Sequence, residues 1–471
     1  MSPRATLRRR AQGSVLIIVL WIAFGLVSLA LYFGHSMMFE LRASDNRVAS
    51  QSAEQIIDGA ARYLTYILTT QISNGSNGQI LDLSAYARDA APVGDGHFWI
   101  IGRDTNTTTG PGFLSFGLVD EASKLNLNTL ISNQVIWLPR MTTDFTMGIL
   151  DWRDTNGNGP TTMFYSMEQP SYLCKNDPFE TVDELRMVYG ADMDTLIGED
   201  FNRNGVLDPN ETDENQNNML DPGLLEYVTV YSREPNPGGI NISNMSSSET
   251  ALRSLLSTNF TTARADEIMV NLGFTSSSGT AGRGPGTTGT TGRGGAGGPA
   301  VTVVVPPLAS PLAFYVKSKM TSTEFAQVAT NFTTTTNSVI TGRVNVNTAS
   351  LAVLTCLLGG DSSAAQQLIN YRLSNANNLP SIAWVTDALG TSYPDALTAI
   401  AGGDYITTQT YQYSADIAAL GPHGRGYRRV KFIFDTSTGT PEIVHRQDLT
   451  HLGWALGVDI RQRWVLAKAT K

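Results

Sequence analysis

The feature that most constrains this chain is one uninterrupted apolar stretch near its start, residues 14–34. The stretch has no charged residue, and a helix of that length, rising 1.5 Å per residue, spans the roughly 30 Å hydrocarbon core of a bilayer. The leader before it carries Arg4, Arg8, Arg9 and Arg10, which favour the cytoplasmic side of a membrane. We therefore predict a transmembrane helix over 14–34, with the rest of the chain on the far side of the membrane.

The residues behind this stretch argue against a secretory signal that is removed, because no A-x-A-like site ends it. Instead, apolar residues repeat at steps of three and four along 35–70, as in a helix with one buried face. These residues are Ala53, Ile56, Ile57, Ala60, Ala61, Leu64, Ile67 and Leu68. We expect the membrane helix to continue as a stalk helix that packs on a folded domain.

The composition is that of a folded and acidic protein. With 471 residues, of which 41% are hydrophobic and 16% charged, the chain should form two or three domains. Its formal charge is −9, and −13 without the four leader arginines, which opposes binding to nucleic acid. Its two cysteines, Cys174 and Cys356, are far apart in the sequence; a disulfide and two free thiols both remain open.

A short phrase recurs along the chain: basic, apolar, Asn, apolar, Asn, Thr. It stands at 124–129 and 343–348, with a weaker copy at 239–243. The alternation predicts a short extended piece whose closing Thr or Ser caps a helix. Residues 349–372 then resemble a helix-hairpin-helix around a Gly-Gly turn, but Asp361 in that turn favours a structural role over phosphate binding.

Several segments alternate as strands do, with Gly-rich turns between them. These segments are 96–102 and 112–119 before the first phrase, and 414–420, 428–435 and 441–445 after the last. The Gly/Thr-rich tract 276–299 lacks apolar residues to bury, which predicts a flexible loop.

The clearest site pattern is residues 200–211, which match a twelve-residue calcium loop. Side-chain oxygens fall at positions 1, 3, 5, 9 and 12, a backbone carbonyl at position 7, and a glycine at the sharp turn at position 6. The predicted ligands are Asp200, Asn202, Asn204, Val206, Asp208 and Glu211. Hard calcium prefers such oxygen ligands, so we predict calcium as a cofactor.

A second copy of the pattern begins at Asp213, and its predicted ligands are Asp213, Asn215, Asn217, Met219 and Asp221. Asn218 replaces the turn glycine and Leu224 replaces the closing glutamate, which a neighbour such as Glu226 could supply. A third fragment, beginning at Asp154, has only the first half of the pattern, and an Asx turn explains it equally well.

Catalytic patterns are missing from the sequence. There is no GxSxG, HExxH or phosphate loop, and the five histidines have no metal-ligand spacing. We therefore predict a protein that is not an enzyme.

The start of the chain resembles the class III signal of type IV pilins and pseudopilins. In that signal a prepilin peptidase cleaves after the glycine, here Gly13, so that the mature and methylated chain would begin at Ser14. Ile18 stands where most subunits have a glutamate. The lack of this carboxylate resembles one minor pseudopilin family of the type II secretion system, called general secretion pathway protein K. Asn345, Asn347, Thr348 and Ala349 match that family's NxNTA element, and Asp151-Trp152 and 179–190 resemble two further stretches.

The resemblance, which covers residue 13 to about 460, implies an α+β fold. A transmembrane and stalk helix would lead into a pilin-like α/β sheet domain with a large inserted all-helical domain, helix-hairpin-helix or SAM-like. The expected boundaries are a leader at 1–13, the membrane helix at 14–34, the stalk at 35–70, the first part of the sheet domain at 71–120, the mostly helical insertion with the calcium loops at 121–400, and a return to the sheet at 401–471.

The function implied by the resemblance is that of a non-catalytic minor pseudopilin at the tip of a periplasmic pseudopilus, where it helps to initiate assembly and protein export. Its partners would be other minor pseudopilins, the inner-membrane platform of the secretion system and the prepilin peptidase. It would be a single-pass protein of the bacterial inner membrane with its C-terminal domain in the periplasm. Two alternatives stay open: a membrane-anchored calcium-binding envelope or adhesion protein, and an anchored DNA-uptake factor, which the acidic charge opposes.

Overall fold

The computed structural model describes residues 13–81, 86, 90–103, 114–275, 305–376 and 379–469. The leader residues 1–12 and the predicted flexible tract 276–299 lie outside the described residues.

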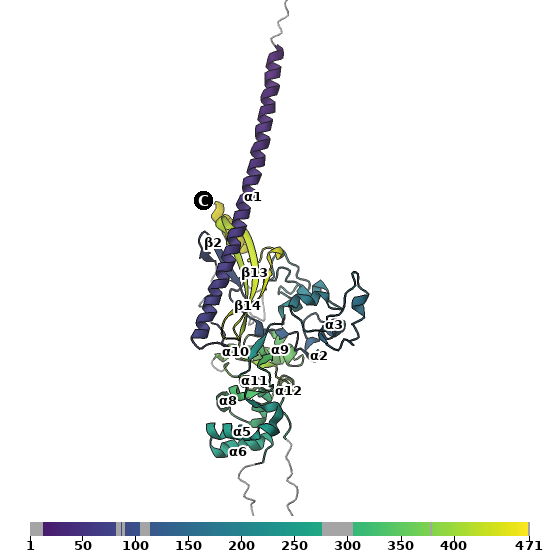
Figure 1. Cartoon of the computed structure of the whole chain (residues 1–471), viewed down its shortest axis with the longest axis vertical. Helices are drawn as coiled ribbons and strands as arrows, with labels where there is room; N and C mark the ends of the chain where they lie inside the picture. Colours follow the sequence, from purple (N-terminus) through teal and green to yellow (C-terminus); the bar gives the residue numbers. More distant parts are fainter. Residues whose placement is uncertain are drawn as a thin grey trace, which may run out of the picture.

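One helix, α1 (Gly13–Ser73), carries both the predicted membrane span and the predicted stalk. Its first part is exposed, reaches a mean hydropathy of 2.7 and is long and apolar enough to cross a membrane. From Ala49 onward one face of the helix is buried, including Ala53, Ile57, Leu64 and Leu68. Figure 1 shows the exposed half of α1 projecting from the body of the protein. The same helix is therefore long and apolar enough for an anchor in its first part and contributes to a core in its second part.

The buried half of α1 packs on a six-stranded antiparallel sheet, in which β3 joins β12 beside the path β1-β2-β12-β13-β14. The strands are β1 (Ala91–Val93), β2 (Gly96–Ile101), β3 (Val119–Asp120), β12 (Gln412–Gly421), β13 (Arg425–Asp435) and β14 (Glu442–Asp448). Four predicted strands are thus confirmed. Of the strand predicted over 112–119, residues 112–113 lie outside the described residues. Over 114–118 the prediction is wrong, because Phe116 makes only a single bridge to Ile101 and β3 begins at Val119.

Helix and sheet meet through small and apolar side chains. Ile100, Ile417 and Phe434 of the sheet lie in one core cluster with Ile57 and Leu64 of α1. The β12–β13 turn comes so close to α1 that a Cβ at Gly421 or Gly426 would lie 2.4 Å or less from backbone atoms of Ala49. Gly426 also has a φ of +69°, so both its conformation and its space require glycine.

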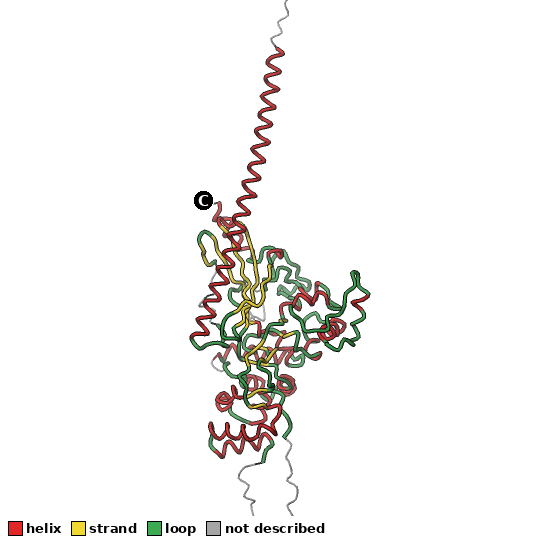
Figure 2. The backbone as a smooth tube through the Cα atoms, in the orientation of Figure 1, coloured by secondary structure: helices red, strands yellow, loops and turns green. Residues whose placement is uncertain are grey.

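Between β3 and β12 the chain leaves the sheet and forms a mostly helical insertion. Its helices are α2 (Ser132–Val135), α3 (Thr143–Arg153), α4 (Met193–Ile197), α5 (Met245–Asn259), α6 (Thr262–Leu272), α7 (Pro311–Ser318), α8 (Ser322–Val328), α9 (Leu351–Leu357), α10 (Ser362–Ser374), α11 (Trp384–Leu389) and α12 (Pro394–Ala401); α13 (Gly457–Ala469) follows the sheet. The insertion has its own apolar core. Figure 2 shows that its helices lie away from the exposed half of α1, beyond the strands. The mixed architecture agrees with the predicted α+β fold.

The insertion also contains short strands, and these explain the repeated phrase. Each copy begins a two-residue strand that pairs in parallel with a later apolar-Thr pair. The pairs are β4 (Leu125–Asn126) with β5 (Val228–Thr229), β7 (Ile240–Asn241) with β8 (Phe332–Thr333), and β10 (Val344–Asn345) with β11 (Ile406–Thr407). A separate antiparallel pair is β6 (Arg233–Pro235) with β9 (Val339–Thr341). The insertion is therefore built from three consecutive modules, 124–229, 239–333 and 343–407.

The first and third modules share further contacts at equivalent positions. In the first, Arg153 at the end of α3 donates hydrogen bonds to the carbonyls of Leu127 and Leu130. In the third, the buried Arg372 near the end of α10 donates to the carbonyls of Val346 (3.2 Å) and Ala349 (2.7 Å). Each arginine thus links the end of its helix to the backbone at the end of the phrase and just after it.

The second Asn of each phrase is used alike as well. Asn128 exchanges two hydrogen bonds with the backbone of Phe179, and Asn347 donates to the carbonyl of Leu379. Residues 154–178 separate these contacts in the first module, whereas the third needs only 373–378. The first module therefore carries an extra segment that the shared framework does not require.

Two adjacent acids join the sheet to the modules. Asp120 accepts hydrogen bonds from Asn345, Thr348 and Thr410 at 2.6–2.9 Å. Glu121 accepts one from Thr229 at 2.6 Å. Burial raises the pKa of Asp120 to about 6, although these hydrogen bonds act against that rise. The opening phrase of the third module and the closing strand of the first thus depend on two buried carboxylates at the end of β3.

Both cysteines are buried and free in the structure, Cys174 in the first module and Cys356 in α9. Burial raises the pKa of each thiol.

The Asp120 junction gives a testable prediction. Asp120→Ala leaves the buried donors of Asn345, Thr348 and Thr410 without their acceptor, so the free energy of unfolding should fall by about 3 kcal/mol. Asp177→Ala, at an exposed carboxylate, should change it by less than about 0.5 kcal/mol. Denaturant titration of the detergent-solubilised chain measures both. Equal effects for the two variants would contradict this role of Asp120.

Candidate functional site

The first predicted calcium loop folds into a tight turn around its own carboxylates. Asp200 accepts hydrogen bonds from the backbone N–H groups of Asn204 and Gly205, both at 2.9 Å. Gly205 has a φ of +80°, which is the conformation that reserves position 6 of such a loop for glycine. The structure therefore gives the loop the backbone turn that its sequence predicts.

The remaining predicted side chains of this loop converge as well. Asn202 and Asn204 both donate to Asp208, at 2.7 and 2.9 Å. Glu211 closes the loop by accepting from the backbone N–H groups of Asn202 (3.1 Å) and Asp208 (2.9 Å). All of these side chains except Glu211 are at least nine-tenths buried. Five predicted ligands from one short segment are thus brought together.

Two arginines of the sheet domain donate hydrogen bonds to backbone carbonyls of this loop. Arg429, in β13, donates to the carbonyls of Asn202 and Arg203. Arg103, just after β2, donates to the carbonyls of Arg203 (2.9 Å) and Asn204 (3.3 Å). Three consecutive carbonyls of the loop are therefore fixed to the sheet, which leaves the carboxylate side of the loop for other contacts.

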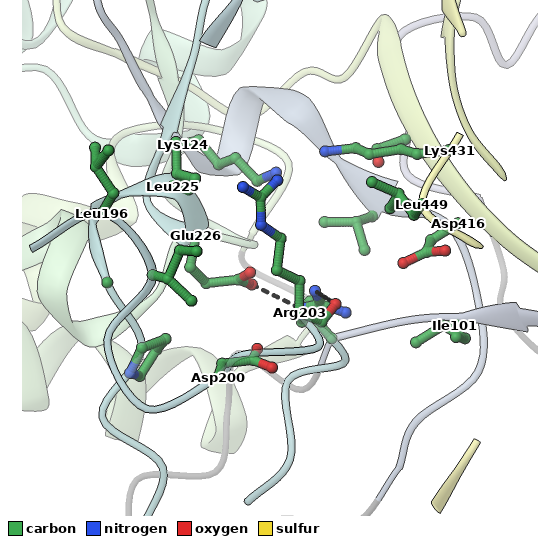
Figure 3. A pocket seen from close by; sticks show the side chains of 16 residues that line it. Ile101, Lys124, Leu196, Asp200, Arg203, Leu225, Glu226, Asp416, Lys431 and Leu449 are labelled. Carbon is green, nitrogen blue, oxygen red and sulfur yellow. Dashed lines mark hydrogen bonds and ion pairs between the residues drawn. The ribbon is translucent and has the colours of Figure 1, made fainter. Parts of the chain in front are cut away.

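The arginines are balanced by buried acids. Arg429 is fully buried and pairs with Asp416 at 2.5 Å, and Arg103 pairs with Glu226 at 2.7 Å. Although burial acts in the opposite direction, Arg103 lowers the pKa of Glu226. Figure 3 shows Asp200, Glu226 and Lys431 around a cavity of about 60 Å³ at this junction. Arg103 and Glu226, and Arg429 and Asp416, thus form buried ion pairs beside it, which limits the cost of burying these charges.

The second loop repeats the hydrogen-bond pattern of the first. Asp213 accepts from the N–H groups of Asn217 (3.2 Å) and Asn218 (2.8 Å), as Asp200 does in the first loop. Asn215 and Asn217 donate to Asp221 at 2.5 and 3.2 Å, as their counterparts do to Asp208. Asn218 has a φ of +57°, a left-handed conformation that asparagine tolerates better than most residues. The missing glycine therefore does not prevent the turn.

The closing carboxylate of the second loop comes from a residue that the sequence analysis did not select. Glu199 is buried, and it accepts from the N–H groups of Glu214 (2.8 Å) and Asp221 (2.9 Å). It thus takes the place that Glu211 has in the first loop. Glu226, suggested from sequence for this role, is instead engaged by Arg103. Glu199 precedes the first loop in the sequence, so a search for a glutamate at position 12 could not find it.

The other predicted sites behave differently. Asp154 accepts from the N–H and side-chain amide of Asn156, at 3.1 and 2.9 Å, which is an Asx turn. Gly13 and Ser14, the predicted processing site, lie in the first turn of α1. Gly359 and Gly360 form the turn between α9 and α10, where Asp361 caps α10 by accepting from the N–H groups of Ser363 and Ala364.

The residues of the first loop fit a calcium ion. The amide oxygen Oδ1 of Asn202 is buried and has no hydrogen-bond partner in the described part of the chain, as expected for an oxygen that a cation would engage. Burial raises the pKa of Asp200 to about 6, and it also raises that of Glu211, to which Asp200 and Asp208 add repulsion. A divalent cation would relieve that repulsion. Within the described residues no three His, Cys, Asp or Glu side chains are already arranged around one point, so the amide oxygens are needed to complete the site.

Comparisons with known proteins add a structural likeness. No protein-family model and no curated protein matches the chain. A chain in the crystal structure of the GspK-GspI-GspJ complex, from the type 2 secretion system of enterotoxigenic Escherichia coli, is 9% identical. The match covers 87% of this chain and 99% of that chain, with a TM-score of 0.39. Because this likeness is loose, we infer the function from the chain's own residues.

We propose that both loops bind calcium. At a calcium concentration of 100 times Kd, binding to one loop should raise the free energy of unfolding by about 2.7 kcal/mol. Glu211→Gln should weaken binding at the first loop about tenfold or more, because it removes half of a bidentate carboxylate ligand. Glu199→Gln should act on the second loop alone. Isothermal titration calorimetry of the detergent-solubilised chain measures each site.

The matched control for these variants is Glu180→Gln, at an exposed glutamate of the same module. It should leave both sites unchanged. A wild-type chain that takes up no calcium, or a Glu199→Gln variant that loses the first site, would contradict the assignment.

Proposed function

We propose that this chain is a minor pseudopilin of a type II secretion system, anchored in the inner membrane by 14–34 before assembly. The observation that carries the proposal is α1, which starts at Gly13 and runs without interruption from an exposed apolar half into the core of an antiparallel sheet. A subunit that must leave the bilayer and enter a helical filament needs such a helix, because the same apolar surface can face either lipid or neighbouring α1 helices. Ile18, in place of a carboxylate, keeps the first turns of that surface fully apolar.

The arrangement of the insertion supports a position at the tip of the pseudopilus. The helices of the middle module lie at the end of the molecule opposite the exposed half of α1 (Figure 1). A body of this bulk beyond the sheet would cap a filament. With other minor pseudopilins it would initiate assembly, while the inner-membrane platform would provide the base. No step of this role requires a catalytic residue.

Calcium would act as a structural cofactor in this role. The first loop is attached to the sheet through Arg103 and Arg429 and belongs to the inserted first module. An ion bound there would stabilise the junction between the module and the sheet, since a ligand that binds only the folded form adds to stability.

The rival function is a membrane-anchored calcium-binding envelope or adhesion protein. It accounts for the anchor and the loops, and it differs from the first proposal at the N-terminus. An ordinary anchored protein keeps its leader of four arginines, whereas a pseudopilin loses it to a prepilin peptidase at Gly13.

Mass spectrometry of the N-terminus decides between the two. The chain extracted from the membranes of its own host should begin at Ser14 with a methylated amine. Gly13→Leu should leave the leader attached, because the peptidase would no longer find its glycine, while Gly34→Leu, on the exposed part of α1 with open space around it, should be processed normally. An intact Met1 on the wild-type chain would favour the anchored binding protein.

A further inference from the structure

The extra segment of the first module, 154–178, forms an unusual surface. Together with 179–187, which follows it, the segment carries four large apolar side chains with high exposed fractions: Met163 (71%), Met167 (72%), Leu173 (84%) and Met187 (46%). These residues belong to the lobe around α3, which projects sideways from the body in Figure 1. Exposed apolar groups gathered on one lobe mark an interaction surface more often than a structural need.

Contacts within the lobe link the backbone segments that carry these four side chains. Met163 and Met167 flank a single 3-10 turn, Phe164–Ser166. The N–H of Tyr172, next to Leu173, donates to the carbonyl of Tyr165 at 3.1 Å. The hydroxyl of Tyr172 donates to the carbonyl of Met187 at 2.8 Å. These contacts place the four exposed apolar residues on the same lobe.

An aromatic cluster lies in the interior of the same lobe. The ring of Tyr165, which is fully buried, lies 5.3 Å from that of Trp152 and 5.4 Å from that of Tyr172. The Phe164 ring lies 4.4 Å from that of Tyr189. The lobe thus combines flexible, exposed methionine side chains with a packed aromatic interior. Such a surface can adapt to partners of different shape without unfolding.

The surroundings of the surface are strongly acidic. Residues 141–198 contain ten Asp and Glu but only three Lys and Arg, so this stretch has a net charge of −7. Five of its carboxylates are exposed: Asp144, Asp177, Glu180, Asp192 and Asp194. Such a field attracts cationic segments and repels anionic lipid and nucleic acid.

We propose that this surface, Met163, Met167, Leu173 and Met187 within their acidic surroundings, binds a cationic amphipathic segment of a partner protein. The apolar side of the segment packs on the methionines and Leu173, and its Lys and Arg face the carboxylates. This combination of soft apolar contacts and acidic rim suits amphipathic helices of varied sequence. The third module shares the framework of the first but has only 373–378 in place of the segment 154–178. The inference does not depend on the proposed pseudopilin function.

The test uses the full chain in nanodiscs of zwitterionic lipid, labelled with ¹³C-methyl methionine. The probe is a synthetic peptide with leucine and lysine at helical spacing. On its addition, the methyl signals of Met163, Met167 and Met187 should shift. Met320, which is buried, and Met37, on the exposed part of α1, should stay in place. Shifts of Met37 that parallel those of Met163 would mean non-specific adsorption and overturn the proposal.

Variants and a second peptide sharpen the test. Met163→Ser with Met167→Ser should weaken peptide binding about tenfold. Leu373→Ser, at a residue of the third module that is 58% exposed, should leave it unchanged. A peptide with glutamate in place of lysine should bind at least about tenfold more weakly. Equal binding of the two peptides, or no shift with either, would overturn the proposal; a shift that depends on chain concentration without peptide would assign the surface to a second copy and overturn it as well.

Discussion

The structure depends on one helix, α1, whose two halves need different surroundings. The N-terminal half of α1 exposes apolar side chains that only lipid or other apolar helices can cover, while its C-terminal half supplies Ala53, Ile57, Leu64 and Leu68 to the core of the sheet domain. Because the helix is continuous, this packing fixes the orientation of the sheet relative to the axis of α1. Glycine at positions 421 and 426 lets the β12–β13 turn approach the helix, so the attachment is tight where α1 emerges from the body.

From that sheet, buried charges and amides organise the rest. Asp120 and Glu121 hold the ends of two helical modules, and Arg103 and Arg429 hold the carbonyls of the first calcium loop. Each of these groups would be costly to bury alone, and each is paired or hydrogen-bonded. The insertion is therefore coupled to the sheet at specific points rather than tethered by a linker, which is what a subunit needs if its distal part is to be held rigidly.

The sequence predicted those features that depend on local pattern. The helix pattern of 35–70, the alternating strands and the loop spacing of 200–211 could all be found because their signals lie within one short segment. The recurring Asn phrase could be found too, but its partners, Val228, Phe332 and Ile406, could not, since a two-residue strand has no recognisable pattern of its own. For the same reason Glu199 was missed as the closing residue of the second loop: its role follows from the tertiary fold. The equivalent contacts that Arg153 and Arg372 make in their own modules likewise become visible only in the folded structure.

Under the proposed function, the apolar half of α1 and the sheet would enter a filament while the modules remain outside it. The most direct test of that account is the export of proteins by a host from which this chain has been deleted. Quantitative proteomics of the medium and the periplasm should find that a set of exported proteins leaves the medium and accumulates in the periplasm, and that the full chain restores their release. An unchanged distribution of extracellular proteins, with the rest of the secretion system present, would contradict a role in the pseudopilus.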